Sequence, residues 1–437
     1  MIATMFVAAA LSFANFPLDE ALHRAVDNSP DVVAASARVA QSAAALGVAR
    51  NLISPSLSTA YAQAPQGNPP GPDVIARTLT VGLQTNITDF LNYGPTVRQN
   101  VLLMSASRAD FATALRTERV RTVGLYYDAL RTRAIADARS QALGLATAQL
   151  DAAQKRFAAG DAPQLDVLRA DVAVARATAD LETARVADEN ALEALRIETA
   201  VPASMLQTTL PVSSLPSVQN VVKNGRSGGV TGGVAGGTTV SIPGLANAAP
   251  FGNVPSAATA VTTALATRAE ISSATATYNA GVAARELAQR TGLPALTVTG
   301  GYTTGTDSGV PIGAPSITAA LNIPFGAAAH DRVLIEEARL AQARAQIEVA
   351  RRAVTLEVAA SARNVTALRR ASAASTRARQ GAQAELAATQ LGYRNGASSS
   401  LEVVIARQTY DQTVVDELGA LYDLAKARAT LAVEVGQ

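Results

Sequence analysis

Apolar and polar residues alternate with a period of two in four short stretches of the chain. In RTLTVGLQTNI, residues 77–87, the side chains of Leu79, Val81, Leu83 and Ile87 share one face, and polar side chains occupy the other. This alternation is typical of a β-strand whose two faces meet different surroundings. By the same criterion, strands are predicted at about residues 55–64, 77–87, 295–304 and 316–325.

Long alanine-rich stretches follow a helical period instead. Between 163 and 199, the small and apolar residues Leu165, Leu168, Val172 and Ala175 keep the alternating three- and four-residue spacing of a coiled-coil seam. Alanines also line much of the opposite face, so each helix can pack against two neighbours, as in a tube of helices. Long helices are predicted at 96–157, 163–199, 330–392 and 400–435, and shorter ones at 18–52, divided at Pro30, and 257–290.

Two glycine-containing breaks with similar sequences interrupt the long helices. The first reads KRFAAGDAPQLDVL, residues 155–168, and the second reads LGYRNGASSSLEVV, residues 391–404. At an offset of 236 residues, Gly160 corresponds to Gly396, Phe157 to Tyr393 and Asp166 to Glu402; the two strand pairs stand at matching places. The order of these features predicts an internal duplication.

The duplication divides the chain into a first repeat, 15–210, and a second repeat, 257–437. Between them, residues 211–256 include GRSGGVTGGVAGGTT and are predicted to be a Gly/Ser-rich insertion or linker. The first 14 residues form an apolar run ending in an A-x-A-like site and predict a signal peptide.

The strands have the length of segments that cross a lipid bilayer. About ten residues suffice for a tilted strand, whereas no stretch after the first 14 residues was expected to make a membrane helix. Four strands cannot close a barrel, and open edges are forbidden in lipid. Three chains together would supply twelve strands, an even number that can close.

Composition excludes several kinds of chemistry. The chain has no Cys, so disulfides and thiolate metal sites are excluded, and its formal charge of +2 gives no drive towards nucleic acid. The two histidines, His23 and His330, stand on separate predicted helices, and no nucleophile elbow, phosphate loop or metal-ligand spacing is present. The sequence therefore predicts no enzyme, no cofactor and no metal site.

The chain resembles the TolC-type outer membrane efflux protein family over nearly its full length. The resemblance is carried by ALHRAVDNSPDVVAA, RFAAGDAPQLDVLRA, LNIPFGAAAHDRVLIEEARLAQARA and YRNGASSSLEVVIARQTY, together with their order and doubling. It implies a mainly α fold with membrane β: a homotrimer with a 12-stranded β-barrel in outer-membrane lipid, continued by a periplasmic α-helical barrel. Such a duct serves tripartite efflux pumps or type I secretion, with a periplasmic adaptor (membrane fusion) protein and an inner-membrane pump of RND or ABC type.

The resemblance also implies where the duct would close. The two breaks would be hairpin tips that meet the adaptor, at Gly160, Asp161, Gly396, Ala397 and Ser398. Glu402 stands at the first of two acidic ring positions of the family, and Tyr393 and Asp166 match residues of its closing contacts. The second acidic position holds Ile405, and Ser398 stands where the family has an arginine, so Arg394 close by is a candidate replacement.

Two alternatives remain open at the level of sequence. Glu402 and Asp166 are also the acids that a helix dipole favours in a first turn, so their role can be structural alone. For the whole chain, a periplasmic coiled-coil adaptor or scaffold without a channel would explain the helices, although not the paired strands. The cargo is not indicated by any motif.

Overall fold

The computed structural model describes residues 17–52, 55–66, 74–201, 256–307, 310–324 and 327–436. The expected signal peptide, 1–14, and residues 211–255 of the Gly-rich segment lie outside the described residues. Two compact units are distinguished. The helical unit comprises described residues 17–32, 115–201, 256–267 and 354–436; the strand unit comprises 33–114 and 268–353 with their undescribed gaps.

The elements follow one another in the duplicated order that the sequence predicts. The first repeat holds α1 (Leu18–Asn28), α2 (Pro30–Arg50), β1 (Ser56–Gln66), β2 (Val74–Asn86), α3 (Thr88–Ala158) and α4 (Gln164–Thr199). The second holds α7 (Ala257–Thr267), α8 (Ala269–Arg290), β3 (Ala295–Asp307), β4 (Val310–Asn322), α9 (Ala328–Arg394) and α10 (Ser400–Val435). This order confirms the mainly helical, duplicated fold.

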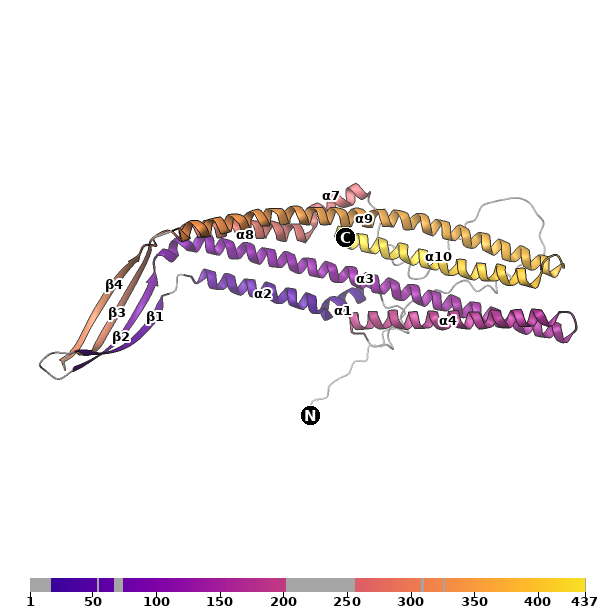
Figure 1. The fold of residues 1–437 in the computed structure, drawn as a ribbon, viewed down its shortest axis with the longest axis horizontal. Helices are drawn as coiled ribbons and strands as arrows, with labels where there is room; N and C mark the ends of the chain where they lie inside the picture. The colour runs from indigo at the N-terminus through magenta and orange to yellow at the C-terminus, as the bar shows by residue number, and fades with distance from the viewer. Residues whose placement is uncertain are drawn as a thin grey trace, which may run out of the picture. The chain divides into compact units, whose positions relative to one another are not determined.

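The four strands form one antiparallel sheet in the order β1-β2-β3-β4 (Figure 1). The two repeats join through β2 and β3, where Gly82 lies opposite Gly301. A Cβ atom on Gly301 would lie 2.9 Å from the carbonyl oxygen of Val81, so the close strand pairing requires glycine there. Apolar side chains on this sheet are uncovered: Ile317 is 85% exposed and Leu321 60%. The sheet therefore has an apolar surface that this chain does not bury.

The strands of the second pair are longer at the turn than predicted. The stretch TGTDSGVPIGAP was expected to be a loop between 304 and 316, but β3 continues to Asp307 and β4 begins at Val310, directly opposite it. β4 is an edge strand, and an edge tolerates proline where the missing N–H points away from the ladder. Pro311 and Pro315 are four residues apart along β4, so their nitrogen atoms face the same side of the strand, and both can face away from β3. At its other end β4 stops at Asn322, three residues before the predicted end.

The helix predicted to begin at 96 begins at Thr88 and includes Pro95. Proline removes the N–H that would bond the carbonyl four residues earlier, which belongs to Leu91. The guanidinium of Arg290 donates to this Leu91 carbonyl instead. Sequence alone could not show this, because the donor comes from α8, about two hundred residues away.

The stretch predicted as one helix over 257–290 is divided. Arg268 adopts an extended conformation, with φ −67° and ψ 127°, between α7 and α8. No proline or glycine stands at this point. Arg268 is buried, and its guanidinium lies 3.1 Å from the carboxylate of Glu270, so a charge contact inside the fold accompanies the break.

The helices of the strand unit are joined by polar contacts. Arg98 of α3 lies 3.1 Å from Glu286 of α8, and Arg285 of α8 lies 2.7 Å from Glu337 of α9. A Cβ atom on Gly281 would come within 3.0 Å of the Leu340 side chain, so α8 and α9 also pack closely through a small residue.

One described helix, α2, is long and apolar enough by composition to cross a membrane. This differs from the expectation that no stretch after the first 14 residues makes a membrane helix. Alanine and serine supply much of its length, with Asp31 in its first turn, Arg38 in its interior and Arg50 at its end. No membrane role is assigned to α2.

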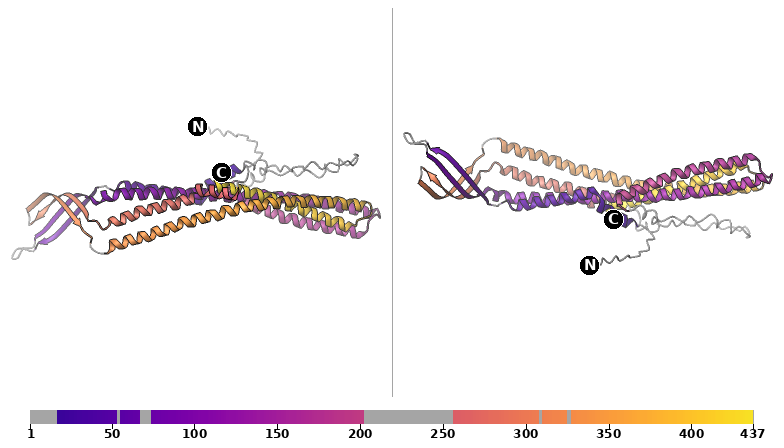
Figure 2. Two further views of the ribbon diagram at one scale, coloured as in Figure 1. Left: turned by 90° about the horizontal axis from the view of Figure 1, so that it is seen from above. Right: turned by 90° about the horizontal axis from the view of Figure 1, so that it is seen from below.

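The helical unit is built from two helical hairpins. In Figures 1 and 2, α4 runs beside α3, and α10 runs beside the second half of α9. An ion pair between the half-buried Arg379 and the buried Glu417 joins α9 to α10. The core consists of Ala21, Val123, Tyr126, Tyr127, Ala129, Leu130, Ala134, Ala138, Leu192, Leu195, Val201, Leu418, Tyr422 and Ala429.

Large side chains gather where α1, α3, α4 and α10 meet. The rings of Tyr126 and Tyr127 pack edge to face, with their centroids 5.7 Å apart. Burial raises the pKa of the Tyr127 hydroxyl to about 12, so both rings stay neutral in the core. Leu195 of α4 is fully buried in this cluster.

Replacing Leu195 by Ala should destabilise the protein by about 2–5 kcal/mol, because a fully buried side chain leaves a cavity. The thermal denaturation midpoint of the purified protein measures this. Ile197→Ala is the matched control, since Ile197 lies on the same helix and is 62% exposed. Equal shifts for the two variants would contradict the proposed position of the core.

Candidate functional site

Each helical hairpin of the helical unit turns at a glycine with a left-handed backbone. Gly160 has φ +83° between α3 and α4, and Gly396 has φ +73° between α9 and α10. A residue with a side chain is strained in this conformation, which explains why both breaks contain glycine at this position.

The two turns have the same hydrogen bonds. The N–H of Gly160 donates to the carbonyl of Phe157, and the N–H of Asp161 donates to that of Arg156. In the second repeat, Gly396 donates to Tyr393 and Ala397 to Gly392, at equivalent positions. Both are Schellman motifs, which cap the last carbonyls of a helix. The duplicated sequence therefore produces a duplicated turn.

The repeats diverge at the residue that precedes the next helix. Ser399 is the N-cap of α10 and forms a capping box with Glu402: its hydroxyl accepts from the Glu402 N–H, and the Glu402 carboxylate accepts from the Ser399 N–H. The equivalent N-cap of α4 is Pro163, which has neither a hydroxyl nor an N–H. Asp166 therefore cannot form a capping box, although it stands at the position equivalent to Glu402.

The carboxylate of Asp166 instead reaches the other hairpin. It accepts a hydrogen bond from the Ser400 hydroxyl at the start of α10. Arg169, one turn further along α4, lies 3.6 Å from Asp166 and donates to the same Ser400 hydroxyl over 3.1 Å. The loss of a cap at Pro163 thus accompanies a contact between the two hairpins.

Tyr393 makes a second contact between the hairpins. Arg156, near the end of α3, donates to the Tyr393 hydroxyl over 3.1 Å. The same guanidinium lies 5.1 Å from the centre of the Tyr393 ring, within cation–π range. Both contacts join the last turn of α3 to the last turn of α9, close to the two glycine turns.

These contacts surround one cleft of about 300 Å³ between the hairpins. Asp166 and Tyr393, both predicted from the sequence as closing residues, line it together with Arg156, Arg169 and Ser400. The full lining is Leu145, Gln149, Ala152, Ala153, Arg156, Ala162, Asp166, Arg169, Ala170, Gln390, Tyr393, Ser400, Val403, Val404 and Arg407. We call this set the tip cleft.

The other predicted residues lie outside the tip cleft. Glu402 and Arg394 are exposed, as are Gly160, Asp161, Gly396 and Ala397 in the turns themselves. Ser398 is half-buried, and its hydroxyl lies against Gly392, where a Cβ atom would clash with it.

Sequence reasoning missed Arg156, Arg169 and Ser400. A signal for part of this contact was present, because Pro163 stands opposite Ser399 in the aligned repeats, so Asp166 cannot form the capping box that Glu402 forms.

A second cleft of about 400 Å³ lies further along the same hairpins. Arg139 of α3 bridges the Asp180 carboxylate at 3.2 Å and the Gln412 side chain at 2.9 Å, so it links α4 to α10. Burial raises the pKa of Asp411, and the adjacent Arg407 guanidinium opposes this shift. Charged and amide side chains thus line the space between the hairpins over several turns.

The described residues contain no group of three or more His, Asp or Glu that could hold a metal ion. The tip cleft has one carboxylate, two guanidiniums and two hydroxyls engaged with one another. These polar contacts join the two hairpins at their tips.

Replacing Arg156 and Tyr393 by Ala, singly and together, should reveal a coupling of about 0.5–1 kcal/mol, because the two side chains share a cation–π contact and a hydrogen bond. Denaturation of the single and double variants measures it. Lys155→Ala replaces Arg156→Ala in the control cycle, since Lys155 pairs with Asp151 on its own helix. Additive effects in the first cycle, or equal coupling in both, would contradict the contact.

Comparison with known proteins gives a family. The family model described as outer membrane efflux protein matches residues 21–197 and 260–437, which is most of both repeats. No curated protein has a significant sequence match to the chain.

Solved structures have the same fold at low sequence identity. The chain is similar to CusC with a TM-score of 0.76 and 16% identity, covering 100% of this chain and 96% of that one. For VceC, the outer membrane protein of Vibrio cholerae, the TM-score is 0.73 with 18% identity and 96% coverage of each chain. For the CmeC outer membrane channel of Campylobacter jejuni, the TM-score is 0.76 with 17% identity, covering 96% of this chain and 85% of that one. With its fold and both repeats matched, the chain belongs to the outer membrane efflux protein family.

Proposed function

We propose that this chain is the outer-membrane exit duct of a tripartite efflux pump or a type I secretion system, and that three copies form it. The observation that carries the proposal is the four-stranded sheet with an uncovered apolar surface. Its outer strands, β1 and β4, each have one side without a partner strand among the residues that the structure describes. Lipid does not tolerate unpaired backbone groups, so further copies must pair these edges.

Three copies would close a barrel of twelve strands, with β4 of one chain pairing with β1 of the next. The membership in an efflux family supports a channel over the alternative of a periplasmic coiled-coil adaptor or scaffold. In this arrangement the strands stand in the outer membrane, and the helices continue from them into the periplasm.

The hairpin tips are the proposed meeting point with a periplasmic adaptor protein. They expose the turn residues Gly160, Asp161, Gly396 and Ala397, with Ser398 half-buried beside them. The partner beyond the adaptor is an inner-membrane pump of RND or ABC type. A proton-driven pump or an ATP-driven exporter encoded beside this gene would distinguish the two systems.

The tip cleft is the proposed fastening that holds the duct closed. Asp166 and Tyr393 connect the two hairpins of one chain through Ser400 and Arg156. Opening the duct requires the hairpins to move apart, so these contacts must break. Arg394 is exposed and is the candidate for a further contact at the tip.

Glu402 has a capping role in the structure, and its exposed carboxylate can also face the axis of a trimer. Three such carboxylates around a narrow axis would create a local negative field that favours cations. The two roles are separable, because the capping box can be broken at Ser399 while the charge of Glu402 remains.

We expect the protein to fractionate with the outer membrane, to resist alkaline carbonate extraction and to run as three chains in native mass spectrometry. The physical reason is the apolar sheet surface and its unpaired edges. In planar lipid bilayers the purified protein should form discrete channels. A monomer released by carbonate would contradict the proposal and favour the scaffold alternative.

Glu402→Ala should reduce the cation selectivity of these channels, because it removes the carboxylate from the proposed ring. Reversal potentials under a salt gradient measure the selectivity. Ser399→Ala is the matched control: it breaks the capping box at a cost of about 1 kcal/mol but leaves the carboxylate in place. If both variants change selectivity alike, or neither does, the ring role of Glu402 is wrong.

A further inference from the structure

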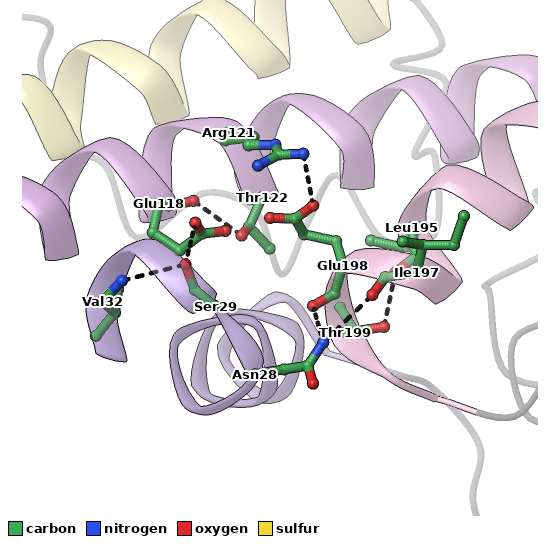
Figure 3. A network of polar contacts seen from close by, with 10 residues as sticks. All are labelled: Asn28, Ser29, Val32, Glu118, Arg121, Thr122, Leu195, Ile197, Glu198 and Thr199. Atoms are coloured by element: carbon green, nitrogen blue, oxygen red, sulfur yellow. Dashed lines mark hydrogen bonds and ion pairs between the residues drawn. The ribbon is translucent and has the colours of Figure 1, made fainter. Parts of the chain in front are cut away.

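A second polar cluster lies in the helical unit, where the α1–α2 junction meets α3 and the end of α4 (Figure 3). Ser29 stands between α1 and α2, and its hydroxyl donates to one carboxylate oxygen of Glu118 over 2.8 Å. Both side chains are only 3% exposed. A buried acid of this kind needs compensation for its charge.

The compensation is incomplete if Glu118 is ionised. Its other carboxylate oxygen, Oε1, is buried, and none of the described residues donates a hydrogen bond to it. A second acid, Glu198 of α4, lies beside it: its side chain is 9% exposed, and its carboxyl group and that of Glu118 point toward one another in Figure 3. Two ionised carboxylates cannot bond one another, because neither has a donor.

One guanidinium, that of Arg121, pairs with Glu198. Arg121 of α3 lies 3.1 Å from Glu198, but its side chain is 60% exposed, so solvent screens its charge. The other charged group acting on Glu198 is Asp31 of α2, which adds negative charge, and α1 supplies only the neutral Asn28. The site thus holds an excess of carboxylates over cations.

The same residues join the helices. The Asn28 side chain donates to the backbone carbonyls of Ile197 and Glu198 over 3.3 and 3.4 Å, at the end of α4. Ser29 holds the start of α2 through the Val32 N–H and bonds Glu118 on α3. Any repulsion between Glu118 and Glu198 therefore acts where α1, α2, α3 and α4 meet.

We propose that Glu118 and Glu198 share one proton, and that this proton fastens the α1–α2 junction and the end of α4 to α3. The proton supplies the missing donor between the two carboxyls, and the pair then carries one negative charge opposite Arg121. Loss of the proton leaves two anions in a buried site, and the junction loosens. The inference concerns the helical unit and does not depend on the proposed duct function.

The electrostatics define the pH range. Burial, together with Glu118, raises the pKa of Glu198 from 4.5 to about 7. Between these values the folded protein binds more protons than the unfolded chain, so stability falls as pH rises. The stabilisation is complete below about pH 4.5 and lost above about pH 7. This range includes neutral pH, at which an ordinary glutamate would not respond.

Hydrogen–deuterium exchange of the intact protein tests the proposal. Backbone amides of 18–32 and 190–201, corrected for intrinsic rates, should lose protection on the order of tenfold from about pH 5.5 to about pH 8.5. Glu198→Gln should abolish this dependence and keep protection at high pH, because the amide carries no charge and can donate to Glu118. Glu118→Gln should act in the same way, with the amide donating to Glu198.

Glu193→Gln is the matched control. Glu193 lies on the same helix, is exposed and pairs with Arg196, so its replacement should leave the pH profile unchanged. A flat profile in the unmodified protein, or a profile in Glu198→Gln equal to that of Glu193→Gln, would overturn the proposal.

Infrared difference spectroscopy of the unmodified protein gives a readout that needs no variant to fold. A protonated carboxyl band that disappears between about pH 6 and about pH 8 is expected. Its absence would also overturn the proposal.

Discussion

The unpaired edges of the four-stranded sheet constrain everything else in this protein. Backbone N–H and C=O groups on the outer sides of β1 and β4 need partners, and the adjacent apolar surface needs a non-aqueous environment. The described part of one chain supplies neither. The proposed trimer meets this need for partners, because only closure of a barrel removes the edges, and it agrees with membership of the outer membrane efflux protein family. The duplication serves this end by supplying two hairpins that pair through β2 and β3.

The duplication also supplies two similar helical hairpins, which contact each other near their turns. Both turns keep the same glycine and the same hydrogen bonds. One difference, Pro163 against Ser399, allows a capping box in the second repeat and not in the first. Glu402 caps its own helix, whereas Asp166 forms no capping box, pairs with Arg169 one turn further along α4 and bonds Ser400 of the other hairpin. Equivalent acids of the two repeats thus make a local cap in one repeat and a tertiary contact in the other.

Alanine side chains are small, so the helices of this protein form only a small apolar core. A buried charge in such a core therefore has a large effect on the stability of the fold. The helical unit concentrates its large side chains around Leu195 and Tyr127 and places Glu118 and Glu198 beside them. Where other folds would surround such acids with several donors, this junction offers Ser29 and one exposed arginine. Protonation is the remaining way to balance the charge.

Hydrophobic period, glycine position and the repeat by themselves determined the order of helices and strands, the sheet-forming segments and the two turns. These features are local, or repeat at a constant offset, and so are visible in one dimension. Only the tertiary structure decided that α3 continues through Pro95, since the replacement donor is Arg290. It likewise decided that Asp166 and Tyr393 share a cleft while Glu402 does not. Such contacts depend on which side chains from distant segments come within bonding distance, and no spacing along the chain encodes that distance.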